Sequence, residues 1–258
     1  MILSSSERRN LPYQRLATTD DGEVAYYIPF ADGNGSETAM SRSGYEWSPE
    51  YLANGRVSVF IAGVPGAGKS YLAKEIINSL PPGADVLLFT ALGEDDGNFD
   101  DLDHPLYKIK MTPENLSRMT LSAIRERSEH PVLLFDDVDK IRDKKVEQAL
   151  FKLMNDALAN GRGHTAHNGE GDIHVVCTSH ALNDYIKTKY TFENSDYVAL
   201  FPGSTAKLQY DRMMSKLGVP KELAEVSYKE GKRGCFRSVI VKKTAPMYII
   251  FGDTISLF

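Results

Sequence analysis

The residues with the clearest chemistry lie in the glycine-rich stretch GVPGAGKS, which runs from Gly63 to Ser70. It fits the pattern G-x-x-x-x-G-K-[ST], in which turned backbone N–H groups surround the β-phosphate and the lysine reaches the β- and γ-phosphates. The serine hydroxyl would bind Mg²⁺. An apolar run precedes the stretch and an amphipathic pattern follows it, as the motif requires. The sequence therefore predicts a P-loop for ATP and Mg²⁺, with these nucleotide contacts: Gly63, Pro65, Gly66, Ala67, Gly68, Lys69, Ser70 and Tyr71.

A pair of carboxylates ends the apolar run of PVLLFDDVDK. Hydrolysis needs one carboxylate for the metal and one group that orients the attacking water. We expect Asp136 to hold the Mg²⁺ shell and Asp137 to act on the water as a catalytic residue. The alternative is a simple strand-end turn, in which aspartate is common. Asp139 is expected only to cap a helix.

Two further polar groups could face the same nucleotide. Arg162 lies in the glycine-flanked stretch NGRGH and could neutralise charge that develops on the γ-phosphate, although a solvated surface arginine is the alternative. Thr178, Ser179 and His180 close the run IHVVCTSH, where the carboxyl edge of an α/β sheet binds ligands. Helix capping is the alternative for this triplet.

The elements that must position these residues alternate along the chain. Short apolar runs typical of buried parallel strands are interspersed with stretches of helical periodicity, which predicts crossover units and a parallel sheet. We expect strands at 56–63, 86–91, 131–135, 173–179 and 197–201, helices at 69–80, 113–127 and 144–159, and a closing hairpin from 237–243 and 246–253.

These elements predict an α/β fold, the three-layer sandwich of a P-loop NTPase with a mainly parallel central sheet and a C-terminal β-hairpin. Residues 1–52 show no sustained periodicity and are rich in loop-forming residues. We therefore expect 1–52 to be a partly irregular N-terminal extension and 53–258 to be the ATPase domain.

The composition of the 258 residues, 42% hydrophobic and 25% charged, is ordinary for a globular protein. Two cysteines are too few for a disulfide framework or a cysteine-rich zinc site, which favours a reducing compartment. The start lacks an apolar signal core, and no run has the length of a membrane-spanning segment. The net charge is −5, but the segment 203–243 holds ten Lys or Arg and four acids, so the charge is unevenly distributed.

Several segments together resemble one known family. They are FIAGVPGAGKS, LLFDDVD, NGRGH followed by IHVVCTSH, and ENSDYVALFPGSTAKLQYDRMMSKLG. From about Val57 to the C-terminus the chain resembles the HerA/FtsK-like DNA-translocating ATPases. Among them it is most similar to the poxvirus-type genome-packaging ATPases of large nucleocytoplasmic DNA viruses.

The resemblance implies an ATP-driven motor that pumps double-stranded DNA into a preformed capsid as a homo-oligomeric ring, with capsid or packaging proteins as partners. It implies a trans-acting arginine finger at Arg162, a sensor at Ser179 and His180, and the catalytic carboxylate at Asp137. The expected location is the viral factory of the host cytoplasm, the nucleus or the virion. Phosphate contacts dominate DNA affinity, so a candidate DNA surface is the set Lys207, Arg212, Lys216, Lys229, Lys232, Arg233 and Arg237, with a solvated face as the alternative.

Two other functions remain open from the residues alone. A P-loop kinase of a nucleoside or other small molecule would share the glycine loop but would work as a monomer with its acceptor. A nucleotide-dependent assembly switch would bind ATP to order a protein interface. Turnover stimulated by DNA would argue against both.

Overall fold

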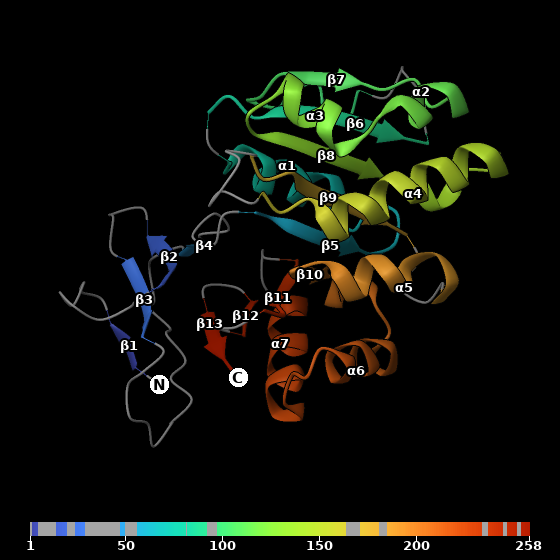
Figure 1. The fold of residues 1–258 in the computed structure, drawn as a ribbon. Coiled ribbons are helices and arrows are strands. Elements are labelled where there is room, and N and C mark those ends of the chain that lie inside the picture. The colour runs from blue at the N-terminus through green and yellow to red at the C-terminus, as the bar shows by residue number, and fades with distance from the viewer. Residues whose placement is uncertain are drawn as a thin grey trace. The chain divides into compact units, whose positions relative to one another are not determined.

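The computed structural model describes residues 2–4, 14–19, 24–28, 47–49, 56–80, 82–91, 97–163, 171–180, 185–233, 237–244, 247–251 and 254–258 (Figure 1). The chain divides into two compact units. The central unit comprises Gly55–Val198, and the terminal unit combines Met1–Asn54 with Ala199–Phe258.

The central unit contains a parallel sheet in the order β5-β9-β8-β6-β7. Its strands are β5 (Ser58–Ala62), β6 (Asp85–Thr90), β7 (Leu106–Lys108), β8 (Pro131–Asp136) and β9 (His174–Ser179). The register pairs Ala62 with Ser179 and Thr90 with Asp136. The carboxyl ends of the strands that carry the predicted site residues therefore meet at one edge of the sheet.

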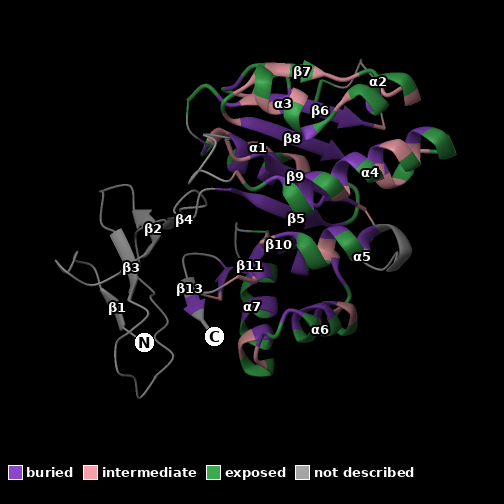
Figure 2. Ribbon diagram, viewed as in Figure 1, coloured by how far each residue is buried: buried purple, intermediate pink, exposed green. Residues whose placement is uncertain are grey.

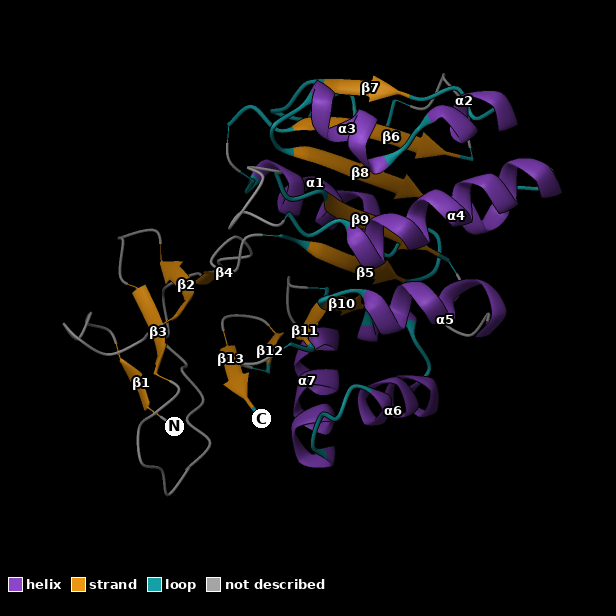
Figure 3. Ribbon diagram, viewed as in Figure 1, coloured by secondary structure: helices purple, strands orange, loops and turns teal. Residues whose placement is uncertain are grey.

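Helices cover both faces of this sheet, as Figure 3 shows. They are α1 (Lys69–Asn78), α2 (Pro113–Arg118), α3 (Leu121–Arg127), α4 (Lys144–Asn160) and α5 (Tyr185–Asn194). α1 lies on the face opposite to that of α2, α3, α4 and α5 (Figure 1). The expected three-layer α/β fold is confirmed.

Burial explains why these segments form these elements. β8 is buried at every position, because helices cover both faces of a parallel sheet (Figure 2). α4 buries a stripe at helical spacing that includes Val146, Leu150 and Ala157. Asp143 begins α4 by accepting hydrogen bonds from the backbone N–H groups of Lys145 and Val146.

The terminal unit holds two antiparallel sets of strands. β11 (Val239–Lys242), β12 (Tyr248–Phe251) and β13 (Thr254–Leu257) pair in sequence. β1 (Ile2–Ser4), β2 (Gln14–Thr19), β3 (Val24–Ile28) and β4 (Trp47–Pro49) form a separate sheet in the order β1-β3-β2-β4. β10 (Tyr197–Leu200) begins in the central unit and ends in the terminal unit.

Two helices complete the terminal unit, α6 (Lys207–Lys216) and α7 (Lys221–Arg233). α7 packs against the 3₁₀ turn η3 (Pro202–Ser204), where a Cβ at Gly231 would lie 2.7 Å from Cγ of Pro202. The Tyr228 hydroxyl, also on α7, donates to the Thr205 carbonyl at 3.1 Å. A larger side chain than glycine at position 231 would separate α7 from this turn.

Most of the expected elements are present, and the C-terminal hairpin is confirmed, with β13 as a third strand. The prediction of a single helix at 113–127 is wrong. Thr120 is extended and caps α3, so the segment forms two helices, α2 and α3. The segment 1–52 was expected to be partly irregular, and β1 to β4 lie within it. The assignment of 53–258 as one ATPase domain stays a prediction, since the division into compact units also cuts the chain within β10.

Candidate functional site

The predicted P-loop is a tight turn between β5 and α1. Gly66 and Gly68 have positive φ angles, 75° and 107°, in the left-handed region that favours glycine. The backbone N–H of Ala67 donates to the Val64 carbonyl at 3.1 Å. Lys69 is the first residue of α1, so the partial positive charge of that helix end lies next to its ammonium group.

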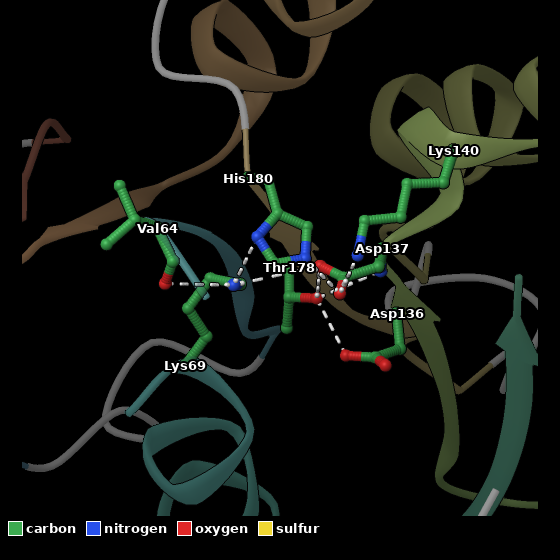
Figure 4. A network of polar contacts seen from close by, with 7 residues as sticks. All are labelled: Val64, Lys69, Asp136, Asp137, Lys140, Thr178 and His180. Carbon is green, nitrogen blue, oxygen red and sulfur yellow. Dashed lines mark hydrogen bonds and ion pairs between the residues drawn. The ribbon is translucent and has the colours of Figure 1, made fainter. Parts of the chain in front are cut away.

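A backbone hydrogen bond joins the loop to β9. The N–H of Gly63 donates to the Ser179 carbonyl at 3.1 Å. This bond continues the pairing of β5 with β9 one residue beyond Ala62. It places Ser179 beside the base of the P-loop and sends the next side chain, His180, toward Lys69 (Figure 4).

The two carboxylates at the end of β8 are linked through Thr178. The Thr178 hydroxyl donates to Asp136 Oδ1 at 2.7 Å and accepts from the backbone N–H of Asp137 at 3.0 Å. Asp136 is 2% exposed. Because β8 and β9 are neighbours in the sheet, this cross-strand contact fixes the position of the Asp136 carboxylate and of the Asp137 backbone.

Asp137 adopts an unusual backbone conformation. Its φ of 49° and ψ of 32° are left-handed, and it is the non-glycine residue with positive φ among the described residues. Aspartate tolerates this region better than most residues, at a cost on the order of 1 kcal/mol. The turn directs the Asp137 side chain away from that of Asp136 and toward His180 (Figure 4).

Lys69, His180 and Asp137 form one polar network (Figure 4). Lys69 Nζ lies 3.1 Å from His180 Nδ1, 3.5 Å from the Val64 carbonyl oxygen and 3.8 Å from Asp137 Oδ1. His180 Nε2 lies 2.5 Å from Asp137 Oδ2. Because an ammonium group only donates, Nδ1 must accept, and the ring proton lies on Nε2 and is donated to Asp137. Lys140 Nζ also contacts Asp137 Oδ2, at 3.4 Å.

Burial destabilises the charged form of Lys69. Its side chain is 6% exposed, and burial lowers its pKa below the ordinary lysine value, an effect that Asp137 and Asp136 oppose. A buried cation is stabilised by nearby negative charge. The triphosphate of a nucleotide would supply more of that charge than two carboxylates do.

The structure does not bring Arg162 to this network. Its guanidinium forms an ion pair with Asp196 Oδ1 at 3.2 Å, and the side chain is 66% exposed. Asp196 Oδ2 accepts from the hydroxyl of Ser58, the first residue of β5, whereas the P-loop follows the last residue, Ala62. The rise of the strand separates these two ends by about 13 Å.

The loop that carries Arg162 has a well-defined stem. Arg125 donates to the Gly171 carbonyl at 3.1 Å and to the Arg162 carbonyl at 3.3 Å. The backbone N–H of Gly163 donates to Asp172 Oδ1 at 2.7 Å. Most of the loop between Arg162 and Ile173, for which the sequence leaves a pore-facing and an inert role open, lies outside the described residues, which stop at 163 and resume at 171.

The residues present fit ATP with Mg²⁺. The left-handed Gly66 and Gly68 turn the loop as phosphate binding requires, and Asp136 ends β8 at the same edge of the sheet from which the P-loop leaves β5. The described residues contain no group of three His, Cys, Asp or Glu that could hold a metal by themselves. Mg²⁺ commonly takes only one or two protein ligands and completes its shell with substrate phosphates and water, so Ser70 and Asp136 would hold it together with the nucleotide.

The other predicted nucleotide contacts differ in their exposure to solvent. Pro65 and Gly66 are exposed, Ala67 is buried, and Gly68 and Ser70 are half-buried. Tyr71 is 67% exposed on α1.

Two side chains of the network were given no role from the sequence. Thr178 belongs to the polar triplet noted in the sequence. Residues two apart in a strand lie on the same face, so the position of Thr178 relative to His180 could have indicated that both side chains face the site. Lys140 follows Asp137 by three residues, but only the 3₁₀ turn η2 (Val138–Lys140) brings the two side chains together. Asp139 was expected to cap a helix and does not, since it lies inside η2 and Asp143 caps α4.

Comparisons with known proteins show what the chain is similar to. The chain is 28% identical, over 237 residues, to "Uncharacterized protein V3" of Sputnik virophage, in an alignment that covers 90% of this chain and 89% of the relative. No helix among the described residues combines the length and apolar character needed to cross a membrane. The model of the ATPase family associated with various cellular activities (AAA) matches residues 59–194, from β5 to the end of α5. The match includes the P-loop, both aspartates, Arg162 and His180, and the chain belongs to this AAA family.

Proposed function

We propose that the chain is an ATP-driven motor that moves double-stranded viral DNA into a capsid and works as a homo-oligomeric ring. The observation that carries the proposal is the division of the predicted catalytic groups. Lys69, Asp137 and His180 meet at the carboxyl edge of the sheet, while Arg162 is exposed at the amino end of β5. If Arg162 is an arginine finger, a neighbouring subunit must supply it.

The residues of the network have distinct roles in this proposal. When ATP binds, its phosphates take the place of His180 and Asp137 as partners of Lys69, because charged phosphate oxygens attract the buried ammonium more strongly. Asp137 then keeps its hydrogen bond from His180 Nε2 and orients a water molecule with its other oxygen. His180 thereby senses whether Lys69 is occupied.

The role of Mg²⁺ in this proposal is to neutralise charge. Mg²⁺ bound at Ser70 and Asp136 would neutralise charge on the β- and γ-phosphates. The hydrogen bond from Thr178 holds Asp136 in the orientation this requires.

The DNA surface remains a proposal, and the contacts in the terminal unit refine it. Lys242 is 1% exposed, so it is not a phosphate contact. Lys207 forms an ion pair with Asp211, and Lys229 with Glu225. Intrahelical pairs of this kind are weak and exchange readily, so they leave the basic segment able to contact phosphates.

The HerA/FtsK-like identity and the viral setting are also proposals. The segment 193–218, which carries the most specific resemblance, extends beyond the residues matched by the AAA model. The similar protein of a virophage supports a viral setting. We propose that the motor acts in the viral factory, the nucleus or the virion, with capsid or packaging proteins as partners.

The deciding experiment measures ATP hydrolysis with and without double-stranded DNA, together with particle size in the presence of nucleotide. We expect DNA to stimulate turnover, the stimulation to fade as salt rises, and nucleotide to favour a ring. Lys69→Ala is the control, because it removes the charge that meets the phosphates and should abolish nucleotide binding or turnover. Phosphate transfer to a small acceptor by a monomer would instead indicate a kinase, and ATP binding without DNA-stimulated turnover would indicate an assembly switch.

A further inference from the structure

The central unit contains a cavity of about 420 Å³ that no step of ATP hydrolysis uses. It lies against β6 and β7, which are neighbouring strands at one end of the sheet, and it is covered by α2 and α3 (Figure 1). No residue of the P-loop and neither aspartate of β8 lines it. Its volume is within the range of sites that bind small ligands or side chains of a partner.

The wall of the cavity is apolar and its rim is cationic. Leu87 and Ile124 are almost fully buried at its base, and Tyr107 is 48% exposed. The cationic side chains that line it are Lys108, Lys110, Arg118 and Arg127, against the single carboxylate of Asp85. An apolar pocket with charge of one sign around it favours a ligand that has an apolar part and negative charge.

Three of these cations lack a compensating charge. Lys108 forms an ion pair with Asp100 at 2.9 Å. Lys110, Arg118 and Arg127 are exposed and make no ion pair with any residue whose position the structure describes. The glutamates of the covering helices, Glu114 and Glu126, are exposed and do not line the cavity. The positive charge is therefore available to a partner.

One residue of the lining carries a buried hydroxyl without a partner among the described residues. Ser128 lines the cavity, and its Oγ is inaccessible to solvent and has no hydrogen-bond partner in the described part of the chain. Buried polar atoms are usually hydrogen-bonded.

We propose that this cavity is a docking site for an acidic peptide segment of a partner protein. One apolar side chain of the segment would enter the cavity, and carboxylates on either side would pair with Lys110, Arg118 and Arg127. These three cations come from separate places, two residues after β7 and the ends of α2 and α3, so they suit charges spaced along a chain better than one compact anion. β7 is the last strand at this end of the sheet among the described strands, so the bound peptide would lie near the edge of the sheet.

The test uses the full chain and a fluorescein-labelled hexapeptide with Leu-Phe at its centre and two glutamates on each side. Binding is followed by fluorescence anisotropy, with a lysine-flanked peptide and labelled duplex DNA as comparison probes. We expect the acidic peptide to bind and the lysine-flanked peptide not to bind. The double variant Arg118→Glu/Arg127→Glu should weaken binding by about tenfold or more, because two attractions become repulsions.

A second variant separates the cavity from its charged rim. Ala123→Phe fills the cavity without changing the charge and should also weaken peptide binding, and the smaller Ala123→Leu serves if the larger residue prevents folding. Lys145→Glu, an exposed cation on α4 that does not line the cavity, is the matched control and should bind the peptide normally. All variants should retain ATP binding, whatever the outcome of the DNA-translocation tests.

Three results would overturn the proposal. The first is equal binding of the acidic and lysine-flanked peptides. The second is peptide binding that both fillings of the cavity leave unchanged in folded protein, which would reduce the site to surface charge. The third is loss of duplex DNA binding, without loss of peptide binding, in Arg118→Glu/Arg127→Glu, which would assign the cations to nucleic acid.

Discussion

The two ends of β5 each hold a buried cation, and they hold it differently. At the carboxyl end Lys69 contacts His180, Asp137 and one loop carbonyl. At the amino end Arg56 donates to three backbone carbonyls, those of Ala157, Leu158 and Ile173, at 2.7 to 3.1 Å. Both cations are 6% exposed, and burial lowers the pKa of both.

The difference shows that burial of a charge does not by itself mark an active site. The carbonyls that hold Arg56 belong to the end of α4 and the residue before β9, so they cannot turn away without unfolding those elements. Two of the three described partners of Lys69, His180 and Asp137, are side chains that can rotate to new partners. An exchangeable network is what a site needs if phosphate is to enter it, whereas Arg56 fixes the loop stem from which Arg162 projects.

The strongest test of this comparison is Arg162→Ala. Arginine fingers contribute roughly three to five powers of ten in rate in related phosphoryl-transfer systems. We expect Arg162→Ala to reduce turnover by about that factor and to leave ATP binding intact, because the side chain lies apart from the P-loop of its own chain. Single-turnover hydrolysis and binding of a fluorescent ATP analogue measure the two properties separately.

Mixing two inactive variants shows whether the site is shared between subunits. Arg162→Ala keeps a complete P-loop, and Lys69→Ala keeps the finger. Once subunit exchange has been demonstrated, the mixture should regain measurable hydrolysis wherever a Lys69→Ala subunit supplies Arg162 to an intact P-loop. No recovery in mixed rings, or full activity of Arg162→Ala alone, would remove Arg162 from the mechanism.

The next effect in size is expected at the carboxyl end, for Asp137→Asn. A positioned acid or base contributes about two to four powers of ten in rate, and the amide cannot accept a proton as the carboxylate does. Turnover should fall by about that amount while ATP remains bound, since Asp136 and Lys69 still meet the metal and the phosphates. If Asp137→Asn loses ATP binding as fully as Lys69→Ala, the roles of Asp136 and Asp137 have been exchanged.

A third effect concerns the amino end, where His174 is 2% exposed and accepts a hydrogen bond from the backbone N–H of Val57 at Nδ1. Burial lowers the pKa of His174 from 6.5 to about 4. The neutral ring therefore contributes stability that is present above about pH 6.5 and is lost as the pH falls toward 4, an effect on the order of 3 kcal/mol in the free energy of unfolding.

Urea unfolding between neutral and acidic pH measures this contribution against a matched variant. The amide oxygen of His174→Asn can accept from Val57 but does not titrate, so the variant should lose less stability on acidification. Equal losses in both proteins would show that His174 does not titrate as its burial implies.

Motifs and apolar runs predicted most of the central unit. The P-loop, the strand-end aspartates and the parallel strands all follow from local patterns whose meaning does not depend on distant residues. The break between α2 and α3 was missed, because helical periodicity continues across Met119 and Thr120 although Thr120 is extended and caps α3. Short strands such as β7 and β13 carry too few residues to show a period.

The contacts of the site were harder to predict than its members. That Thr178 bridges two aspartates depends on the register of β8 with β9, and that Lys140 reaches Asp137 depends on a left-handed residue. The ion pair of Arg162 with Asp196 joins residues 34 positions apart, and no local pattern indicates it.

That ion pair leads to the smallest expected effect, for Asp196→Asn. If Arg162 must leave Asp196 to reach the phosphate bound by a neighbour, the pair stabilises a resting position. The pair is exposed on the arginine side, so it contributes only about 0.2 to 1 kcal/mol. Asp196→Asn keeps an oxygen that can accept from Ser58 and should raise turnover by at most about fivefold.

Asp101→Asn, which removes an exposed ion pair with Lys74 elsewhere in the central unit, is the control and should leave turnover unchanged. A fall in turnover for Asp196→Asn alone would mean that Asp196 holds Arg162 in its working position, and the amino end of β5 would then be as fixed around Arg162 as it is around Arg56.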